Sequence, residues 1–217
     1  MFNMDFSKRV VIDSRSLDWV ASPMAGVWRK PLAREDAEQG HATSIVRYEA
    51  GAHFSAHGHP KGEEILVLAG TFSDESGNYR VGTYFRNPQG FRHAPYSQEG
   101  CVLLVKLHQF QSQDDLHVCV DTRAAEWNPN NGNGLVLPLH ELNTEKVMLV
   151  RCASGRTLHC TATRGGEEIY VIDGELKDSR GSYSAGFWIR TPSKEVRPYH
   201  VEKDALVWLK QGHLPED

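Results

Sequence analysis

The sequence contains an internal repeat whose two copies are related by a constant offset of 104 residues (166 − 62). The segment that begins at Gly62, GEEILVLAG, recurs at Gly166 as GEEIYVIDG. The same offset relates further identical pairs: Gly51 and Gly155, Asp74 and Asp178, Tyr79 and Tyr183, Gly82 and Gly186, Arg86 and Arg190, and Pro88 and Pro192. Self-similarity at a fixed period indicates two copies of one structural unit. We therefore predict two domains, at residues 1–110 and 111–217.

The pattern within each repeat is that of β-strands. Residues 63–70 are apolar on both faces, as expected for a strand buried inside a sandwich or barrel. Residues 101–105 and 205–209 form similar apolar runs, and turn-forming residues cluster at 73–78 and 178–182. Helical periodicity is weak throughout. Short strands at close spacing predict an all-β sandwich or barrel.

The first group of residues with metal-binding chemistry stands just before a predicted strand. His57 and His59 flank a glycine, and Glu63 follows four residues after His59. Successive side chains of an extended chain alternate between faces, so these three odd-numbered residues can point to one side. Two imidazoles and a carboxylate on one face predict a transition-metal site whose fourth ligand comes from elsewhere in the sequence.

A second group supplies a candidate for that ligand. It consists of Gly82, Pro88, Gly90 and His93. A Pro-x-Gly turn followed by a histidine can return the imidazole to the same cavity. Lone histidines are usually surface or core residues with ordinary hydrogen bonds, but this constellation favours a metal site over that alternative.

The two groups resemble the two motifs of the cupin superfamily. Gly51-x5-His57-x-His59-x3-Glu63-x6-Gly70 is similar to the first motif, and Gly82-x5-Pro88-x-Gly90-x2-His93 to the second, apart from its usual closing Asn, where Tyr96 and Ser97 stand. The resemblance implies a tandem double cupin, in which two jelly-roll β-barrels form a bicupin. It also implies that His57, His59, Glu63 and His93 bind a metal in the first repeat.

The second repeat is degenerate at the corresponding positions. Those positions are Thr161, Thr163, Glu167 and Arg197. One carboxylate and one arginine cannot replace three imidazoles, so we expect no metal there. We expect Arg197 to pair with Glu167 inside the barrel where the metal is lost. The alternative is that the Arg197 guanidinium binds a carboxylate ligand.

Other side chains near the two motifs are candidates for a pocket. His53 has the same parity as His57 and could line the same cavity. Phe85, Phe91 and Tyr96 flank the second motif and could wall a pocket, although core packing explains aromatic residues there equally well.

The first repeat narrows the resemblance further. Residues 63–77, EEILVLAGTFSDESG, resemble the cupin domain of the ChrR family. Members are anti-sigma factors that release an extracytoplasmic-function sigma factor under singlet-oxygen stress. Typical members carry an N-terminal zinc-binding domain with a His-x3-Cys-x2-Cys motif, which this sequence lacks. The resemblance implies a regulatory or sensory metal-binding module, with a sigma factor or another regulatory protein as partner.

An enzymatic function is the alternative. ChrR-like cupins are similar to cupin dioxygenases that cleave carbon–carbon bonds in diketones and hydroxyacetophenones, which implies Fe(II) at the four ligands and a small-molecule substrate. Ligand type does not choose among Zn(II), Fe(II), Mn(II), Ni(II) and Cu(II). We expect one divalent ion per chain, with zinc ranked first because of the ChrR resemblance. No further catalytic residue is assigned.

Charge and composition exclude several other classes of function. The net charge of −4 favours neither nucleic acid nor an anionic membrane as a partner. No apolar stretch approaches the roughly 20 residues that span a bilayer, and no secretory leader is recognisable. The four cysteines form no Cys-x-x-Cys pair. We therefore predict a cytoplasmic protein, either monomer or homodimer.

Overall fold

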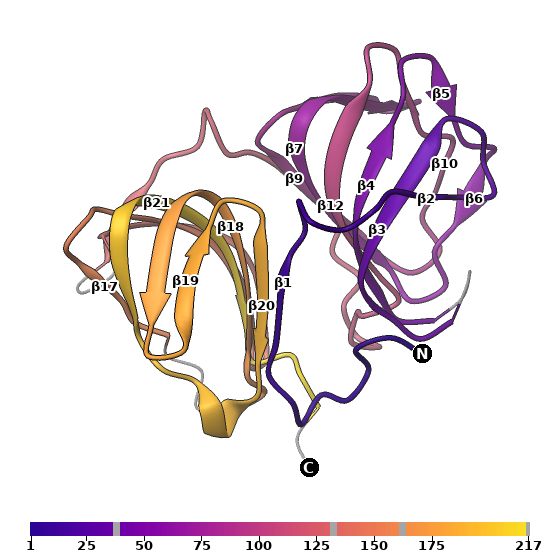
Figure 1. Ribbon diagram of the computed structural model, residues 1–217. Coiled ribbons are helices and arrows are strands. Elements are labelled where there is room, and N and C mark those ends of the chain that lie inside the picture. The colour runs from indigo at the N-terminus through magenta and orange to yellow at the C-terminus, as the bar shows by residue number, and fades with distance from the viewer. Residues whose placement is uncertain (37–39, 131–133, 161–163, 216–217) are drawn as a thin grey trace. The chain divides into compact units, whose positions relative to one another are not determined.

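The structure is a computed structural model that describes residues 1–36, 40–130, 134–160 and 164–215 (Figure 1). The chain divides into two compact units. Unit 1 comprises Met1–Met4 and Leu17–Ala124, and unit 2 comprises Asp5–Ser16 and Ala125–Asp217. No helix among the described residues is long and apolar enough to cross a membrane.

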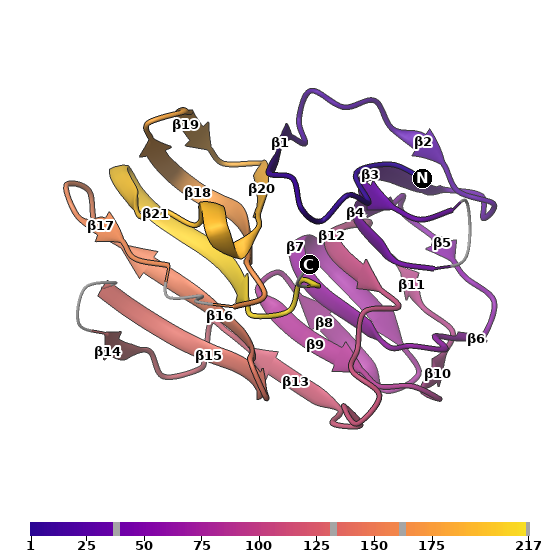
Figure 2. The ribbon, with the colours of Figure 1, turned by 90° about the horizontal axis from the view of Figure 1, so that it is seen from below.

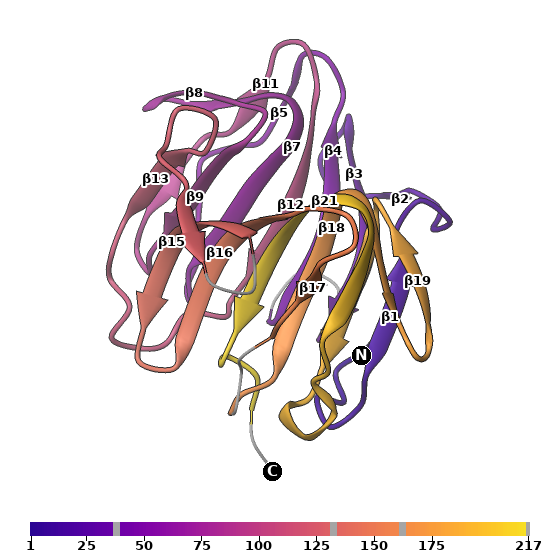
Figure 3. The same cartoon turned by 90° about the vertical axis from the view of Figure 1, so that its left-hand side faces the viewer.

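Unit 1 is built from antiparallel strands. They are β2 (Val20–Ala21), β3 (Val27–Arg34), β4 (Ala42–Tyr48), β5 (Ala52–His53), β6 (His57–Gly58), β7 (Glu63–Asp74), β8 (Gly77–Arg80), β9 (Thr83–Asn87), β10 (Arg92–His93), β11 (Tyr96–Ser97), β12 (Cys101–Leu107) and β13 (Val118–Asp121). The main sheet has the order β13-β9-β7-β12-β4-β3-β2, and β6 pairs with β10 in a separate two-stranded sheet. Figure 3 shows β7, β12 and β4 side by side.

Unit 2 repeats this architecture. Its elements are β1 (Val10–Asp13), β14 (Asn128–Asn130), β15 (Gly134–Leu142), β16 (Glu145–Cys152), β17 (Thr157–Leu158), β18 (Glu167–Asp178), β19 (Gly181–Ser184), β20 (Phe187–Thr191), the 3-10 turn η1 (Ser193–Glu195) and β21 (Tyr199–Gln211). The sheet order is β1-β20-β18-β21-β16-β15-β14, much of which can be followed in Figure 2. The predicted all-β tandem fold is confirmed.

Each repeat opens with a strand that joins the sheet of the other repeat. β13 pairs with β9 in unit 1, with Val118 opposite Arg86. β1 takes the equivalent place on β20 in unit 2, with Val10 opposite Arg190 (Figure 1). The two strands have similar sequences, VVID and VCVD. As a result residues 5–16 belong to unit 2 and residues 111–124 to unit 1, which differs from the boundaries 1–110 and 111–217 expected from the repeat.

The cores of the two units use equivalent positions. Unit 1 buries Ile65, Val67, Phe72, Phe85 and Leu103. The residues 104 positions later, Ile169, Val171, Leu176, Ile189 and Val207, are buried in unit 2. Each such side chain contributes on the order of 1.5 to 3 kcal/mol through its removal from water. The repeat therefore preserves the barrel interior even where the residues differ.

The long strand β7 changes partners halfway along its length. Residues up to Gly70 pair with β12, and residues from Thr71 onward pair with β8. Gly70 has a φ of 69°, and a Cβ there would collide with the carbonyl oxygen of Gly100. Only glycine combines that conformation with so close a backbone approach. The bend brings both ends of β7, Glu63 and Asp74, to the same histidine, as described below.

Candidate metal centre

The three histidines of the predicted site come together in unit 1. His57 and His93 face each other in the β6–β10 ladder, and His59 follows directly after β6. One nitrogen from each of the three rings lies within 4.8 Å of the others. His59 and His93 are buried, and His57 is partly exposed. Residues from two short strands and the adjoining turn thus form a compact group of metal-binding type.

The carboxylate of Glu63 completes this group. Its Oε2 lies 3.4 Å from Nε2 of His59 and 3.4 Å from Nε2 of His93. The two Nε2 atoms are 3.2 Å apart. Donor atoms that bind one transition-metal ion at about 2.1 Å lie roughly 3.0 to 3.4 Å apart for bond angles near 90° to 109°. The three separations agree with that range, so these residues fit one shared ion.

The outward-facing nitrogens of two rings have acceptors. His57 Nδ1 lies 2.9 Å from the carbonyl oxygen of Ser55, and His93 Nδ1 lies 3.4 Å from Oδ2 of Asp74. A carbonyl or a carboxylate can only accept, so each Nδ1 carries a proton, and in the neutral ring Nε2 keeps a lone pair for a metal. Metal-binding histidines donate their second N–H in this way.

Burial and neighbouring carboxylates tune the two inner rings in opposite directions. Burial lowers the pKa of His59, which favours the neutral imidazole that a metal requires. Burial also acts to lower the pKa of His93, but the contact with Asp74 and the charge of Glu63 outweigh it and raise that pKa. The site therefore combines one ring held neutral by burial with one ring polarised by carboxylates.

The carboxylate ligand is itself held in place. Asn87, the last residue of β9, stands opposite Glu63 in the ladder and donates from Nδ2 to its Oε2 over 3.1 Å. Both side chains are buried. This hydrogen bond limits the rotation of the Glu63 carboxylate.

A cavity of about 710 Å³ adjoins the site inside unit 1. His57, His59 and Glu63 line it. Much of the remaining wall is apolar or aromatic: Val27, Val46, Tyr48, Phe54, Ile65, Phe72, Leu103, Val105 and Leu107. Charged side chains also line it, among them Arg29, Lys61, Glu35 and Asp36. This volume suits a small organic molecule, which would be surrounded largely by apolar wall.

The other predicted pocket residues lie elsewhere. Phe85 is packed in the core against Phe72, with ring centroids 5.7 Å apart. Phe91 contacts the His93 ring at 5.7 Å from outside the cavity lining. His53 and Tyr96 are exposed and face each other between β5 and β11. The parity argument for His53 fails because residues 54–56 leave the strand, so the alternation does not continue to His57.

Sequence reasoning missed Asp74, Asn87, Ser55 and Tyr48. In the sequence Asp74 stands out only as a repeated residue, and nothing in its neighbourhood indicates a contact with His93. Tyr48 stands near the end of β4, and burial raises the pKa of its hydroxyl, an effect reinforced by the charge of Glu63. The Tyr48 phenol therefore stays protonated next to the candidate metal site.

The second unit has a different interior. Glu167 is fully buried at the start of β18. Neither of its oxygens accepts a hydrogen bond of normal geometry from a described residue. Burial raises its carboxyl pKa to about 7, against smaller opposing effects of Cys160, Gln211 and Arg9. Among the described residues, Glu167 belongs to no group of three or more side chains that could hold a metal ion.

The expected ion pair between Arg197 and Glu167 is wrong. Arg197 is exposed, and its guanidinium donates to the carbonyl oxygen of Val196 over 2.7 Å. The residues after η1 turn outward, so the repeat offset does not carry this side chain into the barrel. Arg9, from the N-terminal segment, is largely buried and contacts Asp178. Thr161 and Thr163 lie outside the described residues.

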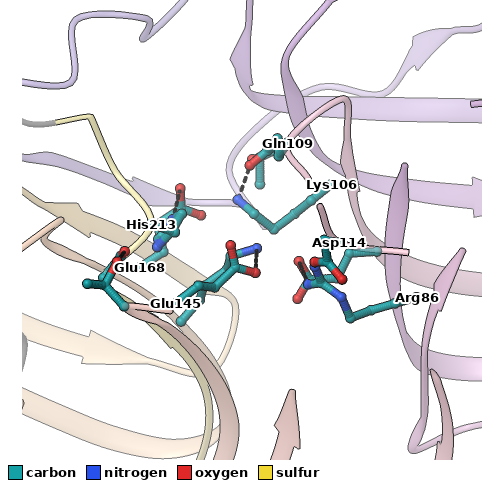
Figure 4. A network of polar contacts seen from close by, with 12 residues as sticks. Arg86, Lys106, Gln109, Asp114, Glu145, Glu168 and His213 are labelled. Atoms are coloured by element: carbon teal, nitrogen blue, oxygen red, sulfur yellow. Dashed lines mark hydrogen bonds and ion pairs between the residues drawn. The ribbon is translucent and has the colours of Figure 1, made fainter. Parts of the chain in front are cut away.

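Each unit also buries charged side chains that are not part of its hydrophobic core cluster. In unit 1, Arg86 Nη1 lies 3.1 Å from Glu64 Oε2, and its other terminal nitrogen pairs with Asp114 (Figure 4). In unit 2, Glu168 lies 3.3 Å from Nε2 of His213 (Figure 4). Loss of one partner of such a pair is costly because the other charge stays buried. We regard these pairs as structural.

Comparison with known proteins identifies solved structures with a similar fold. No curated protein matches the sequence. Among solved structures, the chain is similar to a proposed dioxygenase from Nostoc punctiforme, with 16% identity, a TM-score of 0.78 and coverage of 97% of this chain and 85% of that chain. It is also similar to the bacterial pirin YhhW from Escherichia coli in complex with nickel(II), with 12% identity, a TM-score of 0.73 and coverage of 97% and 100%.

A third similar structure is the Bacillus subtilis oxalate decarboxylase, which contains Mn(II) centres. It is 14% identical, with a TM-score of 0.62 and coverage of 94% of this chain and 78% of that chain. At such low identity these likenesses show the fold alone. The ChrR cupin-like domain matches the sequence twice, at residues 7–111 and 115–215. The chain therefore belongs to the ChrR cupin-like family and is a bicupin.

Proposed function

We propose that the protein is a metal-dependent cupin enzyme that binds a small organic substrate in the unit 1 cavity. The observation that carries this proposal is that three of the candidate metal ligands, His57, His59 and Glu63, line a single cavity of about 710 Å³. A purely structural ion has no need of adjoining space for a ligand. The reaction class we favour is dioxygenation of a diketone or hydroxyketone.

The bound metal would supply Lewis acidity and, as iron(II), redox chemistry with dioxygen. His57, His59, Glu63 and His93 would hold it. The aliphatic and aromatic wall would exclude water from the apolar part of the substrate. Tyr48 lines the same cavity, and its protonated hydroxyl would donate a hydrogen bond to a substrate oxygen.

The similar solved structures support a metal-dependent reaction without specifying it. They include a proposed dioxygenase, a nickel complex and a manganese enzyme. These metals and activities are those of the other proteins. For the present chain, zinc remains the first metal to test on family grounds, and iron(II) is the metal that the dioxygenase reaction requires.

Oxygen uptake by the iron-loaded protein over a panel of diketones and hydroxyketones tests the reaction class. We expect uptake with at least one substrate, its loss in His57→Ala, and a reduced rate in Tyr48→Phe with metal content unchanged. Uptake by His57→Ala at the wild-type rate, or no uptake by the iron-loaded wild type across the panel, would contradict the dioxygenase assignment.

A regulatory role is the second candidate, and the twofold match to the ChrR cupin-like domain favours it. In this case the unit 1 cavity would register an oxidant or small ligand, and a sigma factor or another regulatory protein would be the partner. Co-purification of candidate sigma factors with the full chain, before and after exposure to singlet oxygen, tests it. Oxidant-dependent release supports the role, and the absence of any complex excludes a sigma factor as the partner.

A further inference from the structure

We infer that Asp74 is a positioning residue of the metal centre, which orients the His93 ring so that Nε2 faces the ion. The inference rests on the proposed metal site and adds a residue that the cupin motifs do not contain. It is supported by the contacts of His93, by the contacts of Asp74 and by a comparison with the second unit.

The His93 side chain is buried among aromatic rings. The side chain is 1% exposed, and the rings of Phe72 and Phe91 lie 6.2 and 5.7 Å from its ring. A buried N–H needs a partner, since water cannot reach it. The partner is Oδ2 of Asp74, 3.4 Å from Nδ1, while Nε2 on the other side of the ring faces His59 and Glu63.

Asp74 is fixed by contacts of its own. Its Oδ1 accepts from the backbone N–H of Ser76 over 2.8 Å and from the hydroxyl of Tyr79 over 3.1 Å. The other oxygen is thereby directed toward His93. Because the strand bends at Gly70, Glu63 and Asp74 from the two ends of β7 contact opposite nitrogens of a single ring.

Unit 2 has the equivalent contacts around an aspartate, but a different side chain faces that aspartate. Asp178 Oδ1 accepts from the backbone N–H of Arg180 over 2.7 Å and from the hydroxyl of Tyr183 over 2.7 Å. Its Oδ2 accepts from Nη2 of Arg9 over 2.8 Å. Where the histidines are lost, a permanent cation thus faces the carboxylate that an imidazole faces in unit 1. The aspartate and its tyrosine partner are present in both units. The side chain that faces the aspartate differs, because it is His93 in unit 1 and Arg9 in unit 2.

This arrangement has a defined chemical consequence. With Nδ1–H donating to a carboxylate, the ring keeps its Nε2 lone pair available and becomes a stronger donor to a cation. Removal of such a carboxylate partner typically weakens metal binding about 10- to 100-fold. An amide at position 74 can present either its oxygen or its NH₂ group to the ring, so the ring would no longer be held in one tautomer.

The test compares wild type, Asp74→Asn and the repeat-related control Asp178→Asn in the full chain. The zinc dissociation constant is measured by competition with a chromophoric chelator. We expect Asp74→Asn to bind zinc about 10- to 100-fold more weakly and Asp178→Asn to bind it like wild type. Equal affinity in wild type and Asp74→Asn would overturn the inference, as would equal weakening in both variants.

A second readout separates this inference from the metal site itself. In metal-free protein, at a pH where the His93 ring is neutral, the ¹⁵N chemical shifts of His93 report which nitrogen carries the proton. We expect the Nδ1–H form in wild type and Asp178→Asn, and a mixture in Asp74→Asn. If wild type binds no zinc but shows this pattern, the metal proposal fails and the orienting contact stands. If the pattern is absent, the inference fails. Tyr79→Phe, expected to weaken zinc binding less, replaces Asp74→Asn if that variant does not fold.

Discussion

Arg9 donates from Nη2 to Oδ2 of Asp178 over 2.8 Å, although 169 positions separate the two residues in the sequence. The Arg9 guanidinium also lies 3.0 Å from the hydroxyl of Tyr183. The side chains of Arg9 and Asp178 are 11% and 9% exposed. The N-terminal segment therefore does more than add an edge strand to unit 2, because it delivers the cation that neutralises a largely buried carboxylate.

Replacement of Arg9 tests this structural role. We expect Arg9→Ala to lower the free energy of unfolding by roughly 3 kcal/mol, since it leaves Asp178 largely buried without its cation. Lys8→Ala is the control, because its ion pair with Asp5 is exposed and such pairs contribute little to stability. Urea unfolding of both variants measures the difference. Equal, small losses in both would contradict the assignment, and zinc affinity should not change in either.

The pH dependence of stability should contain a contribution from Glu167. Its carboxyl pKa is about 7 in the folded protein, against an ordinary value of 4.5. Between these values the folded state keeps a proton that the unfolded state releases. The free energy of unfolding therefore falls as pH rises through this window, by about 3 kcal/mol in total from this group.

Glu167→Gln isolates that contribution. The variant should be close to wild type in stability at pH 4.5 and more stable than wild type at pH 8, because glutamine carries no charge to bury. Thermal or urea unfolding at both pH values measures the change in the difference between the two proteins. Parallel stability profiles of wild type and variant across this range would show that Glu167 is not protonated in the folded state at neutral pH.

The hydrogen bond from Asn87 to Glu63 leads to a prediction about affinity. Asn87→Ala should weaken zinc binding about tenfold, because the Glu63 carboxylate loses the contact that restricts its rotation. The control is Thr191→Ala, since Thr191 takes the equivalent place opposite Glu167 in unit 2. Chelator competition measures both, and an affinity of Asn87→Ala equal to that of the control would argue against a role for Asn87.

The sequence was sufficient to predict the repeat, the all-β tandem fold and the convergence of His57, His59, Glu63 and His93. The repeat is visible as identical residues at one offset, and the convergence of the four side chains depends on the spacing of the two motifs within the first repeat. The approach of the three histidines and Glu63 follows from motifs whose turns and strands have fixed lengths.

The exchange of edge strands could not be predicted. VVID and VCVD are short β-type segments, and nothing in them selects one sheet edge over another. The role of Arg9 depends on that exchange and therefore could not be predicted either. The contact of Asp74 with His93 depends on the bend at Gly70, and a carboxylate eleven positions after Glu63 gives no local signal of such a bend. The Arg197 prediction failed because the offset does not specify the direction of a side chain after a turn.

Elemental analysis of protein purified without added metal tests the metal centre most directly. Wild type should contain about one transition-metal ion per chain, as expected for a folded site with deprotonated ligands. The double variant His57→Ala/His59→Ala should contain almost none, and Thr161→Ala, at the equivalent position of the second repeat, should match wild type. Metal that persists in the double variant, or that is lost equally in Thr161→Ala, would contradict a single metal centre in unit 1.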